Sequence, residues 1–199
     1  MSLPHITLLY SLSGLGVGFL VGLTGVGGGS LMTPILVLLF GVHPATAVGT
    51  DLLYAAATKA TGTLVHGLKG SIDWRVTLRL AAGSVPAATA TLILLHRYGM
   101  DSKHTSTLIQ VVLGAALLIT AVALVFRPQL ARLAARRERP EAPLRTFWLT
   151  VLTGAILGTL VSLTSVGAGA IGVTVLLLLY PALPTSRIVG SDIAHAVPL

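Results

Sequence analysis

The sequence predicts an all-α integral membrane protein, a polytopic helical bundle with two related repeats, and three observations carry this prediction. Hydrophobic residues make up 54% of the 199 residues and charged residues 10%, and the mean hydropathy is +0.90. A soluble domain needs about 25% charged residues to cover its surface, so a soluble enzyme and a disordered chain are excluded. Several long apolar stretches follow one another, and a pair of motifs occurs twice in the same order.

The apolar stretches differ in length, and length predicts which of them cross the membrane. They lie at about 6–22, 30–41, 45–66, 76–95, 106–126, 147–163, 169–180 and 186–199. A full span needs about 20 residues, which the stretches at 45–66, 76–95 and 106–126 provide. The stretches at 30–41 and 169–180 are too short, and each follows a glycine-rich run. Such segments are typical of the broken helices of transporters.

The repeated motifs predict a duplication. Leu23–Gly29 matches Leu163–Gly169, and, after an intervening proline in each copy, Val48–Asp51 matches Val189–Asp192. Five apolar stretches separate the starts of the two copies, and an odd number predicts that the copies are inverted in the membrane. We expect a first repeat over 1–126 with about five membrane segments, and an incomplete second repeat over 146–199.

Basic residues gather between the two repeats. Six arginines lie within 127–145, in a chain with 13 basic and 6 acidic residues. Positively charged loops stay on the cytoplasmic side of a membrane, so residues 127–145 are predicted to form a basic cytoplasmic loop. The net charge of +7 therefore needs no nucleic-acid partner. The chain has no cysteine, which excludes disulfides and thiol catalysis.

The glycine runs are candidate anion sites. A helix that starts near membrane depth presents free backbone N–H groups and a partial positive charge, and glycine lets a small anion approach closely. The alternative is a tight helix crossing that needs small residues. A phosphate-binding loop is excluded because no Gly-Lys-Ser or Gly-Lys-Thr follows either run. The candidate residues are Gly27, Gly28, Gly29 and Ser30 in the first copy, and Gly167 and Gly169 in the second.

Two acidic residues occupy equivalent positions, six or so residues into helices predicted to begin near Pro44 and Pro184. Charged residues inside membrane segments are costly and usually face a polar pathway. Asp51 and Asp192 are therefore candidates for proton coupling, and the hydroxyls of Thr50 and Ser191 beside them are candidates for substrate binding. Alternatively, each carboxylate only stabilises the start of its own helix.

Lys59 lies eight residues after Asp51, a spacing that places both side chains on nearly the same face of a helix. It would attract an anionic substrate or neutralise the aspartate. The alternative is that its ammonium reaches to the membrane interface.

Catalytic and metal sites are not predicted. Asp192 and His195 have the spacing of a metal-binding pair, but the sequence places no further ligands with them. No Gly-x-Ser-x-Gly motif occurs. We therefore expect no enzyme activity, no metal and no cofactor.

At the repeated motifs the chain resembles the TauE/SafE family, the sulfite-exporter-like membrane permeases. The matching segments are Gly22–Ser30, Pro34, His43–Asp51, Gly70–Trp74 and, more weakly, 163–192. The resemblance implies a permease of the bacterial inner (plasma) membrane that carries sulfite, sulfoacetate or related organosulfonates or carboxylates. It also implies that Gly27 to Ser30, Gly49 to Asp51 and their counterparts line the pathway.

The chain departs from the family pattern in two ways. Ser162, Ser165 and Ala168 stand where the first copy has Gly22, Gly25 and Gly28, so the two halves would contribute unequally. The final spans of the second half are absent, so either the sequence is a fragment or a partner chain, for example in a homo-oligomer, supplies the missing wall. The alternative function is a truncated, non-transporting membrane subunit or assembly module.

Overall fold

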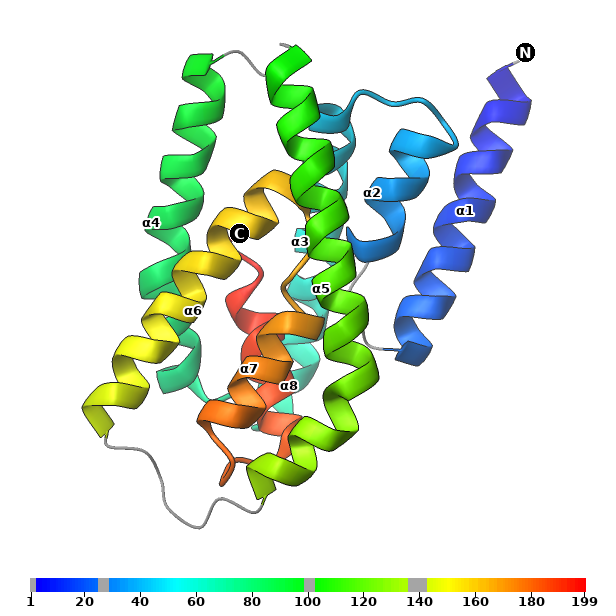
Figure 1. Ribbon diagram of the computed structural model, residues 1–199. Helices are drawn as coiled ribbons and strands as arrows, with labels where there is room; N and C mark the ends of the chain where they lie inside the picture. Colours follow the sequence, from blue (N-terminus) through cyan, green and yellow to red (C-terminus); the bar gives the residue numbers. More distant parts are fainter. Residues whose placement is uncertain (1–2, 25–28, 99–102, 136–142) are drawn as a thin grey trace.

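The computed structural model describes residues 3–24, 29–98, 103–135 and 143–199, which form eight helices (Figure 1). In chain order they are α1 (Leu3–Thr24), α2 (Gly29–Leu38), α3 (Pro44–Leu68), α4 (Trp74–Tyr98), α5 (Lys103–Ala135), α6 (Pro143–Thr164), α7 (Ala170–Leu179) and α8 (Thr185–His195). No strand occurs in these residues. The predicted all-α membrane fold is confirmed.

Three of the described helices are long and apolar enough to cross a membrane, namely α4, α5 over Lys103–Leu130, and α6. The stretch at 45–66, whose length predicts a full span, forms the 25-residue helix α3 but is not among these three. Asp51, Lys59, His66 and several threonines lower its hydropathy. A helix with this composition needs neighbours that cover its polar side chains.

The two short helices occur where the sequence predicts them. Helices α2 and α7 have ten residues each, and each follows a glycine run. Figure 1 shows that α2 begins near mid-height and runs towards one end of the bundle, whereas α7 begins near mid-height and runs towards the other. A helix of ten residues is about 15 Å long, so each crosses about half of a hydrocarbon core.

Helices α7 and α8 lie inside the bundle. Val173 and Leu176 of α7 and Ile188 of α8 form a buried cluster with Val76 and Leu80 of α4. Helix α5 buries Ile109, Leu113 and Ala116 on one side. On its other side, apolar side chains are exposed, namely Leu108, Val111, Leu118, Val122 and Val125. Apolar residues on the outer surface suit contact with lipid.

Helices α4 and α6 cross with their backbones in contact. A Cβ atom on Gly154 of α6 would overlap the carbonyl of Leu80, and one on Gly158 would overlap the carbonyl of Ser84. From the other side, a Cβ atom on Gly83 of α4 would overlap the carbonyl of Val151. Small residues at these positions allow the close approach.

A polar contact also fixes α4 and α6 relative to the end of α7. The hydroxyl of Tyr180 accepts a hydrogen bond from the Arg79 guanidinium at 3.2 Å and lies 2.8 Å from the hydroxyl of Thr150. The inner helices are therefore attached to the long ones by hydrogen bonds as well as by packing.

The basic segment at 127–145 differs from its prediction as a loop. Helix α5 continues to Ala135, and α6 begins at Pro143; the rest of the segment lies outside the described residues. Leucine, alanine, arginine and glutamine have high helix propensity, and residues 127–135 are rich in them, so the helix extends past Pro128. The interpretation as a loop is wrong for residues 127–135 and 143–145.

Candidate functional site

The two acidic residues lie at matching places in α3 and α8. Helix α3 begins at Pro44, and Pro184 is the residue before the first turn of α8, as the sequence predicts. Proline is favoured at such positions because it has no N–H to leave unsatisfied and its φ angle suits a helix start. Asp51 is 1% exposed and Asp192 is 2% exposed, so both carboxyl groups are inside the protein.

Asp51 connects the two halves of the chain. Its Oδ2 atom accepts a hydrogen bond of 2.9 Å from the hydroxyl of Thr33 in α2. The hydroxyl of Ser165, in the second glycine run, lies beside the same carboxyl group. Neither Asp51 Oδ1 nor Ser165 Oγ has a hydrogen-bond partner within the described part of the chain. Buried polar atoms that make no well-aligned hydrogen bond are costly, and such atoms are typical of a functional site.

Asp192 lies against the first turn of α7. Its carboxylate interacts with the backbone N–H of Gly169, the residue that precedes α7. Its Oδ1 atom is so close to the backbone of Gly172 that a Cβ atom there would overlap it. No described residue makes a hydrogen bond to this Oδ1. The negative charge of Asp192 therefore lies where the backbone of α7 is partially positive.

Lys59 lies near both acidic residues. Its ammonium interacts electrostatically with both Asp192 and Asp51, and its side chain is partly buried. A cation that faces carboxylates in a low-dielectric site is attracted several times more strongly than it would be in water. Asp192 of α8 is therefore close to the face of α3 on which Asp51 and Lys59 are predicted to lie.

The turn before α7 brings the backbone towards this group. Gly167 and Gly169 have φ angles of 125° and 119°, in the region that favours glycine. Both glycine carbonyls accept hydrogen bonds from α7. The N–H of Gly172 donates to the Gly167 carbonyl at 3.2 Å, and the N–H of Val173 donates to the Gly169 carbonyl at 3.3 Å. A residue with a side chain at either of these two positions would strain the backbone.

Two predicted residues, Thr50 and Ser191, are not in this group. Thr50 is exposed and donates a hydrogen bond to the Thr46 carbonyl of its own helix. Ser191 is buried, but its hydroxyl accepts a 2.8 Å hydrogen bond from the Asp73 N–H and donates to the Arg187 carbonyl at 2.7 Å. Its bonds therefore hold α8 to the turn before α4.

The structure describes only a part of the first glycine run. Gly27 and Gly28 lie outside the described residues, and Gly29 is the first residue of α2. Ser30, in the first turn of α2, is buried. Whether this run faces the same group as the second one stays a prediction.

His195 and Ser84 are buried residues that sequence reasoning did not select. The Nε2 atom of His195, in α8, lies 2.8 Å from the hydroxyl of Ser84 in α4. Both side chains are fully buried, and no described residue bonds to His195 Nδ1. His195 also interacts electrostatically with Lys59. Its spacing of three residues from Asp192 was the available signal, because it places both on one face of α8.

Ser84→Ala is expected to lower the free energy of unfolding by about 1–3 kcal/mol, because it leaves His195 Nε2 buried without a partner. Chemical unfolding of the purified protein in detergent measures this change. Ser162→Ala is the matched control. Ser162 is also buried, but within the described residues its hydroxyl bonds to the Gly158 carbonyl of its own helix. Equal losses for the two variants would contradict the pairing.

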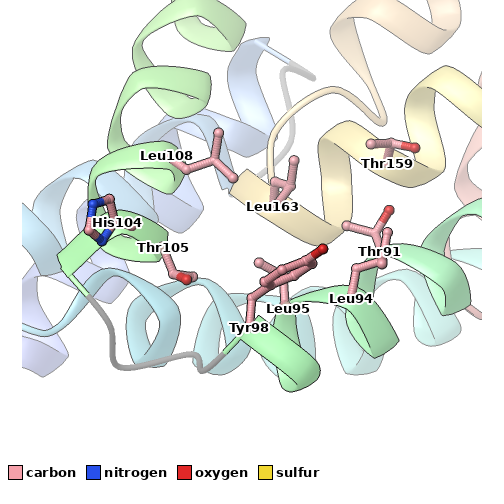
Figure 2. A pocket seen from close by; sticks show the side chains of 9 residues that line it. All are labelled: Thr91, Leu94, Leu95, Tyr98, His104, Thr105, Leu108, Thr159 and Leu163. Atoms are coloured by element: carbon pink, nitrogen blue, oxygen red, sulfur yellow. The ribbon is translucent and has the colours of Figure 1, made fainter.

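A separate apolar cavity lies between the ends of α4, α5 and α6 (Figure 2). Its volume is about 620 Å³, and the lining includes Leu95, Tyr98, His104, Leu108 and Leu163. None of the predicted site residues lines it. The buried acidic and basic residues, and not this cavity, are therefore the candidate site.

Comparison with known proteins gives consistent matches. A family model described as "Sulfite exporter TauE/SafE" matches residues 10–199. The chain is 39% identical over 186 residues to "Probable membrane transporter protein YjnA" of Bacillus subtilis (strain 168), an alignment that covers 93% of this chain and 72% of that protein.

Two shorter matches carry similar names. The chain is 43% identical over 68 residues to "Probable membrane transporter protein YunE" of Bacillus subtilis (strain 168), which covers 34% of this chain and 25% of that protein. It is 40% identical over 60 residues to a "Probable membrane transporter protein" of Xylella fastidiosa (strain 9a5c), which covers 30% and 23%. No solved structure matches the chain significantly.

Proposed function

Because the chain belongs to the sulfite exporter TauE/SafE family of membrane transporters, we propose that it carries small anions, such as sulfite, sulfoacetate or related organosulfonates or carboxylates, in a process coupled to protons. One observation carries this proposal. Lys59 of α3 interacts with the acidic residues of both copies of the motif, next to the start of a broken helix. A single group of side chains thus joins the two halves.

The anion would bind at the start of α7. The glycine turn at 167–169 brings backbone N–H groups and the positive end of the helix dipole to this position. Lys59 would add a full positive charge to the same region. An anion of the size of sulfite needs only a few such donors, and a backbone without side chains admits it.

The coupling proton would be carried by Asp51 and Asp192. Both are buried, and each has a carboxyl oxygen without a hydrogen-bond partner in the described residues. A buried carboxylate is stabilised when it gains a proton or a cation. Protonation in step with anion binding would link the two fluxes.

The two halves would alternate as inverted repeats, a first one over 1–126 and a second over 146–199. The opposite directions of α2 and α7 in Figure 1 support this arrangement. Transporters built this way expose a central site first to one side of the membrane and then to the other.

Proteoliposomes that contain the purified chain test the proposal. A proton gradient is expected to drive accumulation of labelled sulfite well above that of empty liposomes. Asp51→Asn is expected to lose this accumulation while exchange of internal for external sulfite continues, because the amide cannot carry the proton. Unchanged accumulation by Asp51→Asn would remove the coupling role.

Asp73→Asn provides a control with an acidic residue outside the site. Asp73 Oδ1 accepts hydrogen bonds from the N–H groups of Arg75 and Val76 at the start of α4, and we expect this variant to transport as the unchanged chain does. Absence of any flux with sulfite, sulfoacetate and other organosulfonates would contradict the permease and favour the assembly module.

A further inference from the structure

The Asp192 carboxylate occupies the position at the start of α7 that suits a transported anion. It interacts with the N–H of Gly169, and its Oδ1 lies against the backbone of Gly172. Glycine at 172 is what permits this approach. A carboxylate and a sulfonate present similar negatively charged oxygens, so one place at the helix start suits either of them but not both together.

Few charged side chains near Asp192 are available to balance its negative charge. Among the described residues, Lys59 and Asp51 of α3 and His195 of α8 are the titratable groups of this cluster, and α7 contributes none. His66 of α3 lies about two turns beyond Lys59, beside Gly190. Lys59 is the cation that faces Asp192, and it is shared with Asp51. A second anion here would meet a negative charge that is only partly neutralised.

We propose that Asp192 is an internal anion that competes with the transported anion for the start of α7, so that the anion binds there only when Asp192 is protonated. This inference rests on the proposed function and deepens it. It assigns the competition with the anion to one of the two carboxyl groups and gives the sign of the coupling, because a proton is taken up as the anion binds. Anion and proton would therefore move in the same direction.

The repulsion between two negative charges determines whether the Asp192 carboxylate and the anion can both lie at the start of α7. Two negative charges about 4 Å apart in a protein site repel strongly enough to weaken binding on the order of a thousandfold. A proton on Asp192 removes that repulsion and also weakens its hold on the Gly169 N–H. The anion then gains this donor, together with the undivided attraction of Lys59.

Asp51 does not have the same position. Its Oδ2 atom bonds to the hydroxyl of Thr33, a side chain of α2, and the Ser165 hydroxyl also lies beside it. A hydroxyl is able to rotate and accommodate either protonation state. Asp192, by contrast, is held by the backbone of α7, where the anion would bind. The competing role is therefore assigned to Asp192 alone.

Binding measured as a function of pH tests the inference on the full chain in detergent. Sulfoacetate is the probe, because its charged groups stay ionised between about pH 5.5 and pH 8. The affinity of the unchanged protein is expected to fall by up to about tenfold for each pH unit over the upper part of this range. Asp192→Asn is expected to bind with little dependence on pH, and at least tenfold more tightly than the unchanged protein at about pH 8.

Proton uptake gives a second readout that does not depend on affinity. When sulfoacetate is added in weak buffer with an indicator dye, the unchanged protein is expected to take up about one proton for each anion bound, and Asp192→Asn none. Gly172→Ala keeps the charge but moves the carboxylate away from α7, so it is expected to reduce the pH dependence as well. Asp73→Asn should retain the behaviour of the unchanged protein.

The possible failures are distinguishable. If the unchanged protein binds sulfoacetate or sulfite, and Asp192→Asn shows the same pH dependence and the same proton uptake, competition by Asp192 is overturned while anion transport stands. If neither anion binds to the unchanged protein or to either variant, the proposed anion function fails, and the inference fails with it.

Discussion

Gly154→Ala is expected to lower the free energy of unfolding by about 2 kcal/mol or more, a large fraction of the stability of a small protein. The added Cβ atom would overlap the carbonyl of Leu80, and backbone atoms have no other rotamer to adopt. Helices α4 and α6 would have to separate. The same separation would disturb Ser84, whose carbonyl touches Gly158 and whose hydroxyl bonds to His195.

Chemical unfolding in a mild detergent, followed by circular dichroism, measures this loss. Gly114→Ala in α5 is the matched control, because nothing lies within 4 Å of the position that its Cβ atom would take. Alanine favours a helix over glycine by up to about 1 kcal/mol, so the control should be unchanged or slightly more stable. A Gly154→Ala protein as stable as the Gly114→Ala protein would contradict the backbone contact.

Helix lengths and starts were predictable because they depend on local sequence. A run of apolar residues sets the length of a membrane helix, and a glycine run interrupts it. This reasoning placed the ten-residue helices α2 and α7 and the starts of α3 and α8. The extension of α5 to Ala135 differs from the predicted loop, because arginine favours helix as well as marking a cytoplasmic segment.

Contacts between helices depend on partners far apart in the chain, and few local signals predict them. The crossing of α4 and α6 has one such signal, the Gly154-x-x-x-Gly158 spacing within an apolar segment. The pairing of His195 with Ser84, 111 residues apart, has none.

The candidate site was predicted in part. Asp51, Lys59 and Asp192 are brought together, whereas Thr50 and Ser191 bond elsewhere. Residues that are adjacent along a helix point about 100° apart, so a hydroxyl next to an aspartate in sequence faces a different neighbour. Helical spacing, and not adjacency, was the dependable guide.

Lys59→Met is expected to have a large effect on both stability and anion binding. Methionine retains most of the side-chain volume but leaves Asp51 and Asp192 without the cation that faces them both. Because the lysine is partly exposed, we expect a loss of about 1–3 kcal/mol in the free energy of unfolding. The affinity for sulfite should fall at least about tenfold, because the remaining charges in the site are negative.

A double-mutant cycle separates the charge effect from lost packing. The double variant Lys59→Met/Asp192→Asn lacks one of the two carboxylates that Lys59→Met leaves unpaired. It should therefore regain part of the stability that Lys59→Met loses, with a coupling energy of about 1 kcal/mol or more. Lys69→Met is the control, because this lysine is exposed at the end of α3, and its change should stay within about 0.5 kcal/mol. If the effects of Lys59→Met and Asp192→Asn simply add, the two residues do not interact, and Lys59 would then have no part in joining the two halves of the chain.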